Sequence, residues 1–234
     1  MKRILAAAAL AALAVPAAAA ERRYTVTDFD RIVIEGPFNV RLATGGPSSA
    51  VATGTPEALE RVSVEVQGRT LRIRPNRSAW GGYQGTAAGP VALEVTTREL
   101  RSATVTGPGN LAIDRAESMR LDLAVEGSGR IGAGQVAADN LVVGLLGSGR
   151  VQVAGTAREL RASIHGWADL DAAGLTARDA NITTDTAGRI AVAVERQATV
   201  TAGGIGEVAI LGTPACTVRG PSAGLVVCGD RSRR

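Results

Sequence analysis

Apolar and polar residues alternate along most of the chain, in short runs that recur about every 20 residues. One set of runs comprises residues 121–125, 141–145, 160–164, 180–182 and 198–202. A second set comprises residues 111–113, 131–133, 151–153, 170–172, 190–192 and 208–210. Alternation of this kind is typical of β-strands with one buried face. We therefore predict short strands throughout residues 91–227, where no segment has the apolar period of a helix.

A glycine-containing unit separates each run of the first set from the next run of the second set. It consists of a glycine, two variable residues, a polar or charged residue and an aliphatic residue, as in Gly-Ser-Gly-Arg-Ile at 127–131. Its copies begin at Gly107, Gly127, Gly147, Gly166, Thr186 and Gly204, in steps of 18–20 residues. Residues 36–40 resemble an isolated early copy, and residues 220–225 a lengthened final copy. Because corners and strands share one period, we interpret the chain as a repeat protein.

A β-solenoid accounts for this period, because each repeat would form one coil that buries its apolar face against the neighbouring coils. Coils of this kind stack about 4.8 Å apart, and a glycine at the corner lets the chain turn with a positive φ. A β-sandwich, with strands about 8–12 residues apart, is the alternative. The solenoid predicts one inward column of stacked side chains, made of Leu123, Val143, Ala162, Ile182 and Val200.

The chain before residue 97 follows the pattern less regularly. Strands are predicted at residues 31–34, 40–43, 49–53, 62–66 and 70–74, with a hairpin turn at 67–69. Thr55 and Pro56 suit a helix N-cap and first helical position, so one helical turn is expected up to Arg61.

The division of the chain follows from these patterns. We interpret residues 21–96 as irregular first coils with a cap, interrupted by a glycine-rich insertion at 76–90. Residues 97–230 are the regular coils, and residues 231–234 a basic tail. A separate small β domain at residues 21–96 is the alternative.

The first 20 residues have the pattern of a cleaved signal peptide. Lys2 and Arg3 precede an apolar stretch at residues 4–15, Pro16 ends that stretch, and the small residues Ala18 and Ala20 suit signal peptidase. The stretch is shorter than the approximately 20 residues that a membrane-spanning helix needs. We therefore expect an exported protein of the periplasm or cell surface, without a transmembrane segment after signal removal.

Composition supports thin stacked coils and argues against nucleic-acid binding. Glycine accounts for 29 of 234 residues, while aromatic residues make up only 3%, so the core must be built from small aliphatic side chains. Loss of Lys2 and Arg3 with the signal peptide lowers the formal charge from +4 to +2. A nearly neutral exported chain lacks the basic face that DNA or RNA binding requires.

Several parts of the chain resemble the putative auto-transporter adhesin, head GIN domain family. The similar parts are the opening Phe-Asp-Arg-Ile-Val-Ile-Glu-Gly-Pro-Phe-Asn-Val-Arg-Leu at 29–42, the hairpin at 68–73 and the repeated Gly-Ser-Gly corners. The resemblance covers nearly the whole mature chain and implies a right-handed parallel β-helix in an exported bacterial protein. It implies no catalytic or binding residues, and the chain departs from the pattern at Trp167 and Thr186.

Titratable residues give little sign of catalysis or of a cofactor. His165 is the only histidine and falls outside the inward positions of its run, so we expect it to face solvent without a metal. Sugar-cleaving enzymes also use parallel β-helices, and they need two carboxylates about 5–10 Å apart. The outward acids Asp122, Glu126 and Asp185 are instead spread over different coils. A carbohydrate-active enzyme, a polysaccharide lyase or hydrolase, is therefore the alternative function.

The residue after each corner forms a charged column in the predicted solenoid. Its members are Asn110, Arg130, Arg150, Asp169, Arg189 and Glu207. The alternating signs from Arg150 onward indicate a ladder of exposed ion pairs, each contributing about 0–1 kcal/mol. A basic ridge that binds acidic glycans is the alternative interpretation.

Cys216 and Cys228 are the only cysteines, and an oxidising compartment favours a disulfide between them. Such a bond would hold the last coil, whose open edge could otherwise pair with other chains. Two free thiols are the alternative.

Three aromatic residues are candidate ligand contacts. Trp80 and Tyr83 lie in the glycine-rich insertion, where they could bind a sugar or protein or else cover one end of the core. Trp167 lies at a predicted corner. We therefore expect a non-enzymatic binding or structural module, with an envelope glycan or another envelope protein as its partner.

Overall fold

The chain folds into a β-solenoid whose coils each contain roughly 20 residues, as the sequence predicts. The computed structural model describes residues 20–76 and 89–229. The regular coils are built from β9 (Asn110–Gly127), β10 (Arg130–Gly147), β11 (Arg150–Gly166), β12 (Asp169–Thr186) and β13 (Ile190–Ala202). Neighbouring strands of this series pair in parallel, each with the equivalent strand of the next coil.

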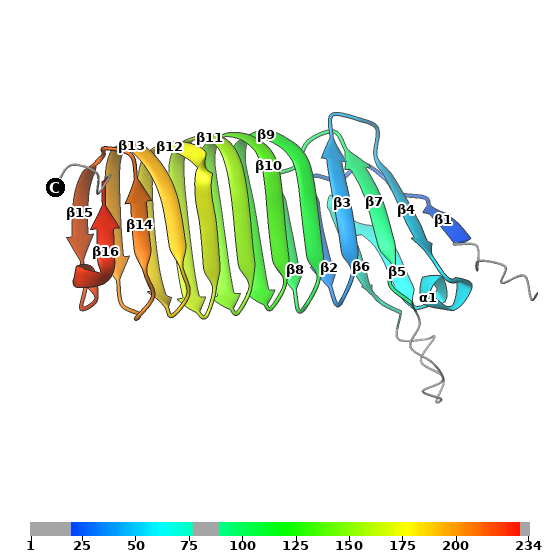
Figure 1. The fold of residues 1–234 in the computed structure, drawn as a ribbon. Helices are drawn as coiled ribbons and strands as arrows, with labels where there is room; N and C mark the ends of the chain where they lie inside the picture. Colours follow the sequence, from blue (N-terminus) through cyan, green and yellow to red (C-terminus); the bar gives the residue numbers. More distant parts are fainter. Residues whose placement is uncertain (1–19, 77–88, 230–234) are drawn as a thin grey trace, which may run out of the picture.

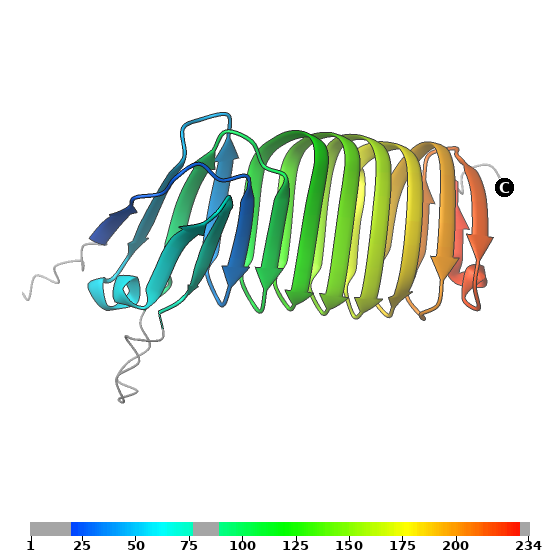
Figure 2. The same cartoon turned by 180° about the vertical axis from the view of Figure 1, so that it is seen from behind.

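The solenoid has two faces, which we call the front and back faces after their positions in Figure 1; Figure 2 shows the molecule from behind. The front face consists of β1 (Ala20–Tyr24), β4 (Ser49–Gly54), β7 (Ala92–Thr97), β3 (Asn39–Thr44), the first parts of β9–β13, β14 (Val208–Leu211) and β16 (Val226–Cys228). The back face consists of β5 (Val62–Gln67), β6 (Thr70–Pro75), β2 (Arg31–Glu35), β8 (Ser102–Thr106), the last parts of β9–β13 and β15 (Ala215–Arg219).

The prediction of short strands was wrong for the regular coils. Each of β9 to β12 is one strand of 17 or 18 residues that curves from the front face to the back face. The curve is the rounded upper edge in Figure 1, whereas the sharp glycine corners form the lower edge. Parallel hydrogen bonds between coils continue through the curve, since small inward residues such as Ala116 and Ala177 fit there. The pairing register shifts within the curve, for example between Ala133 and Val136, and the ladder is interrupted again at each glycine corner.

The predicted inward column is confirmed residue by residue. Val143 is paired with Leu123 on one side and Ala162 on the other, and the column continues to Ile182 and Val200. All five side chains are buried in one continuous apolar core. Stacking places each of them between two others, so burial depends on the neighbouring coils and not on the coil itself.

The corner glycines allow successive coils to approach closely. Gly147 has a φ of 114°, which L-residues with a side chain rarely adopt. A Cβ atom at this position would lie 2.7 Å from the carbonyl oxygen of Gly127 in the preceding coil. The corner therefore requires glycine for both its backbone conformation and its packing.

The N-terminal strands share both faces with the regular coils. On the front face β3 is paired with β7 and β9, and on the back face β2 is paired with β6 and β8. The hairpin β5–β6 and helix α1 (Pro56–Glu60) form as predicted, with Thr55 Oγ1 accepting a hydrogen bond from the Ala58 N–H at 3.2 Å. Strands β1, β4 and β5 run antiparallel to their neighbours, so the pattern of parallel coils ends there.

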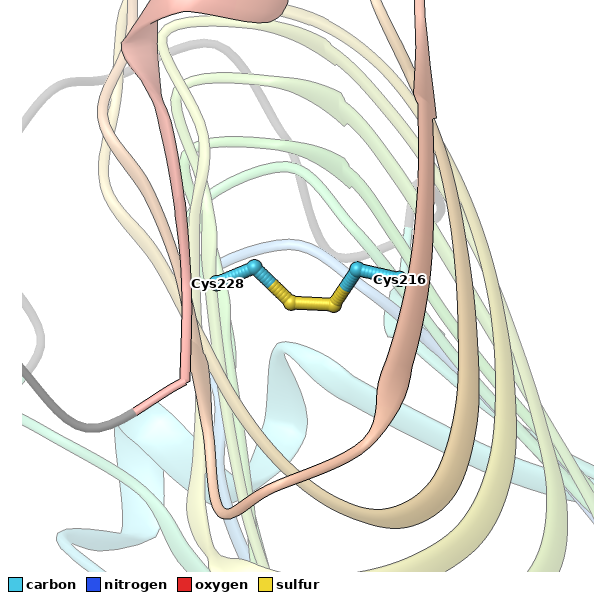
Figure 3. Close-up of a disulfide and its surroundings, with 2 residues drawn as sticks. All are labelled: Cys216 and Cys228. Carbon is cyan, nitrogen blue, oxygen red and sulfur yellow. A yellow bond between two sulfur atoms is a disulfide. The ribbon is translucent and has the colours of Figure 1, made fainter.

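At the opposite end, a disulfide joins the two faces. Cys216 lies in β15 and Cys228 in β16, with their Cα atoms 6.6 Å apart, and Figure 3 shows the bond crossing between the two strands. A short 3-10 helix, η2 (Ala223–Leu225), connects these strands and replaces the ordinary corner. A cross-link closing a loop of this size stabilises by about 3 kcal/mol in the chain-entropy description.

A charge placed in the inward column should disrupt two coil interfaces at once. We expect Val143→Asp to lower the free energy of unfolding by at least about 3 kcal/mol, because the buried carboxylate has no partner. Val142→Asp is the matched control, since Val142 faces outward between Asp122 and Arg161 and should change stability by no more than about 1 kcal/mol. Urea denaturation of both variants checks this, and equal losses would mean that the inward register is wrong.

The corner glycine offers a second matched pair. Gly147→Ala should cost about 2–4 kcal/mol, since it adds a strained φ and a clash with the preceding corner. No atom lies within 4 Å of a Cβ built on Gly132, in the strand that ends at the same corner. Gly132→Ala should therefore leave stability unchanged or raise it by about 0.5 kcal/mol. Thermal and urea unfolding of both variants measure this. Equal changes in stability for Gly147→Ala and Gly132→Ala would mean that the close approach of the corners is unimportant.

Candidate functional site

The outermost residues of the glycine corners form a column along the lower edge of the solenoid, which we call the tip column. Backbone hydrogen bonds from Ser148, Trp167 and Ala187 to the preceding corner fix their order, and the repeat of the corner unit places the other members. From the first regular coil onward its members are Pro108, Ser128, Ser148, Trp167, Ala187 and Ile205. The column is small or polar at first and changes to a large apolar residue at Trp167.

Trp167 is held by its backbone while its side chain remains in solvent. Its N–H donates to the Gly147 carbonyl oxygen at 2.7 Å, as the Ser148 N–H does to Gly127 at 2.8 Å one coil earlier. The side chain is nevertheless 73% exposed. Replacement of serine by tryptophan therefore preserves the corner and adds a large apolar surface outside the core.

Thr186 departs from the pattern in a different way, because its side chain is buried. Its Oγ1 lies 3.0 Å from the Gly166 carbonyl oxygen and 3.1 Å from that of Ala168, and accepts the Gly188 N–H at 3.0 Å. One hydroxyl thus supplies hydrogen bonds to both sides of the corner. This substitution supports the backbone and leaves no side chain for a ligand.

The charged column beside the tips is an ion-pair ladder in its second half, as the alternating signs predict. Arg150 Nη2 lies 2.6 Å from Asp169 Oδ2, and Arg189 Nε lies 3.9 Å from Glu207 Oε2. Arg130 makes no ion pair among the described residues. Because acids neutralise the arginines from Arg150 onward, the geometry favours the ion-pair ladder over a continuous basic ridge.

A surface hollow of about 690 Å³ lies on the front face between this ladder and the corners. Small residues at the corners and in the strands form its floor, including Ala187, Gly188 and Ala191. Polar and charged side chains surround it, and Ile205, which is 79% exposed, forms its apolar side. The hollow is therefore an open, mostly polar surface with one exposed apolar side chain at its side.

Asp169 is the most firmly held acid of the hollow. Its Oδ1 accepts the Arg189 backbone N–H at 2.8 Å, while Arg150 binds the other oxygen. The Arg189 N–H, and after it the Arg150 guanidinium, lower the pKa of Asp169 below its usual value. The carboxylate is therefore ionised at neutral pH and acts only as a hydrogen-bond acceptor.

His165 is exposed on the back face, as its position in the alternation predicts. Its Nε2 lies 3.2 Å from Ser163 Oγ, and Asp185 is its neighbour in the next coil. No hydrogen bond joins His165 to Asp185 among the described residues. The imidazole is therefore not oriented by a carboxylate in the way that a general base of a catalytic triad is.

The other predicted contacts lie outside the part of the chain that the structure describes. These are Trp80 and Tyr83 of the insertion, the basic tail at 231–234, and the predicted signal peptide apart from Ala20. Within residues 20–76 and 89–229, no three histidine, cysteine or acidic side chains group as metal ligands would. No helix in these same ranges is long and apolar enough to cross a membrane.

Sequence reasoning missed a buried carboxylate near the start of the solenoid. The Asp30 side chain is only 6% exposed and lies between Arg69, whose Nε is 2.9 Å from Oδ2, and Arg101, whose Nε is 3.8 Å from it. Each residue precedes the first residue of a back-face strand, so pairing of β6, β2 and β8 brings the three together. A charged residue immediately before each strand was the available signal.

Comparison with known proteins supports the fold. The family described as putative auto-transporter adhesin, head GIN domain matches residues 28–214. A putative adhesin from Bacteroides fragilis is 19% identical with a TM-score of 0.74, covering 91% of this chain and 94% of that one. A putative lipid binding protein from Parabacteroides distasonis is also 19% identical, with a TM-score of 0.69 and coverage of 91% and 97%. No curated protein matches the chain.

Removal of the buried charge at Asp30 should be more costly than removal of an exposed one nearby. We expect Asp30→Asn to lower the free energy of unfolding by about 1–3 kcal/mol, since a charge-assisted hydrogen bond with Arg69 is lost. Glu99→Gln removes an exposed partner of Arg101 and should cost about 0–1 kcal/mol. Urea denaturation at low salt compares the stability of the two variants. Equal losses of stability would show that burial of Asp30 does not strengthen its ion pair with Arg69.

Proposed function

The chain belongs to the putative auto-transporter adhesin, head GIN domain family, and we propose that it is a non-enzymatic, adhesin-like binding module of the bacterial cell envelope. Its partner is an envelope glycan or another envelope protein. The predicted signal peptide supports export to the periplasm or cell surface. The Cys216–Cys228 disulfide supports the same location, since such bonds persist in oxidising compartments.

One observation carries the proposal: the fold is held by inward aliphatic side chains, while the outward positions vary freely from coil to coil. Along the tip column, serine, tryptophan, alanine and isoleucine occupy equivalent corners of the same solenoid. A scaffold of this kind displays side chains at fixed spacing without using them for stability. Binding residues on a rigid support lose little conformational entropy when a partner binds.

The pairing of the outward acids favours binding over sugar cleavage. A hydrolase of the two-carboxylate type needs one acid whose pKa is raised so that it can donate a proton. Here Asp122 pairs with Arg120, and Asp169 with Arg150. The hydrogen bond from Arg196 lowers the pKa of Asp179, whereas a general acid needs a raised pKa. These acids suit a hydrogen-bonding surface.

Two assays on the purified protein test this function. With pectin, alginate or peptidoglycan and added Ca²⁺, we expect no release of reducing or unsaturated ends. On a glycan array, or in a pull-down from envelope extract, we expect retention of a specific glycan or envelope protein by the folded chain and not by urea-unfolded chain. Release of sugar ends would contradict the proposal in favour of a carbohydrate-active enzyme. Absence of any retained partner would also contradict it.

A further inference from the structure

The large apolar residues of the tip column are spaced to flank a ring. Trp167 and Ile205 are two coils apart, and Ala187 lies between them. Two strand spacings of about 4.8 Å separate the larger side chains, which leaves room for one planar group above the alanine. Both large side chains are exposed, so they are available to a ligand and not committed to the core.

Polar groups of the adjoining hollow remain available for hydrogen bonds. The Arg189 guanidinium lies too far from Glu207 for a hydrogen bond and makes none elsewhere among the described residues. Asp169 accepts hydrogen bonds on both oxygens, and its side chain is still 30% exposed. Ile205 lines the hollow, whereas Trp167 lies just outside it, two residues before Asp169 at the same corner. An exposed indole next to donors and acceptors suits a pyranose, whose C–H face packs on the indole while its hydroxyls form hydrogen bonds at the ring edge.

The charges of the hollow select against acidic sugars. Two arginines, Arg150 and Arg189, stand against three carboxylates, Asp169, Asp171 and Glu207, so the local formal charge is 2 − 3 = −1. A polyanionic chain such as polygalacturonate or heparin would be repelled, whereas a neutral glycan can use the arginines as donors and the acids as acceptors.

The extent of the hollow indicates a short oligosaccharide and not a single sugar. From Arg150 to Glu207 it crosses four coils, with at least one charged residue in each. Three coil spacings of about 4.8 Å give a length of about 14 Å along the solenoid axis. A linear glycan lying parallel to the axis would therefore meet a new coil at each sugar.

We propose that the corner formed by Trp167, Ala187 and Ile205, with the hollow beside it, binds a neutral linear glycan. One sugar ring stacks on Trp167, and its hydroxyls bond to Asp169 and Arg189. This site rests on the proposed binding function and gives it a location and a ligand class. Recognition requires no metal and no covalent step.

Calorimetric titration tests the site with neutral hexasaccharides, namely cellohexaose, laminarihexaose and chitohexaose. We expect the full chain to bind at least one, and Trp167→Ser to raise its Kd at least about tenfold. Serine is the residue at two equivalent corners, Ser128 and Ser148, so the melting temperature should change by less than about 2 °C. Met119→Ser is the matched control, because Met119 is as exposed as Trp167, at 79% against 73%, but lies away from the corner.

Fluorescence gives an independent readout of the same residue. The chain has two tryptophans, so in Trp80→Phe all tryptophan emission comes from Trp167. Binding should shift or quench this emission, and oligogalacturonate should not compete. The site is refuted if Trp167→Ser binds as the unsubstituted chain does, or if the anionic oligomer is preferred; in either case the general binding function stands. No binding to these sugars, to the glycan array or to envelope extract would remove the binding function as well.

Discussion

Stacking of aliphatic side chains between coils is the interaction on which the rest of the structure depends. Each coil is too thin to have a core of its own, so a residue such as Val143 is buried only because Leu123 and Ala162 lie above and below it. The same requirement explains the glycine corners. Coils can stack at strand spacing only if nothing at the corner holds them apart, and a Cβ at Gly147 would do so.

Because the inward side chains hold the coils together, the outward positions can vary without loss of the fold. Trp167 replaces a serine with no change in the corner's hydrogen bond, whereas Thr186, which is buried at the next corner, must satisfy the backbone with its own hydroxyl. The fold therefore tolerates Trp167 but depends on the hydroxyl of Thr186. Exposed ladder pairs such as Arg150–Asp169 add little stability, but they set the local charge of the surface.

The sequence predicted the solenoid well. Alternation with period two identifies the inward residues of each strand, and the spacing of the corners shows which of these residues stack in one column. The continuous curve of β9 to β12 was not predictable in the same way, since hydrogen bonds between coils persist where side-chain alternation shifts. Asp30 escaped notice because its arginine partners, Arg69 and Arg101, are distant in sequence and meet only through strand pairing. The hollow was also not predicted, since it arises where strand pairing places small residues such as Ala191 beside charged residues such as Asp171 of an adjacent coil.

Hydrogen exchange of the backbone amides tests most directly whether aliphatic stacking holds the coils together. Amides of β10, β11 and β12 should exchange with one shared opening free energy, because no inner coil can open without exposing its neighbours. That free energy should not fall when salt is raised to about 1 M, where exposed ion pairs are screened. Separate opening free energies for the inner coils, or a marked loss of protection in salt, would contradict the account.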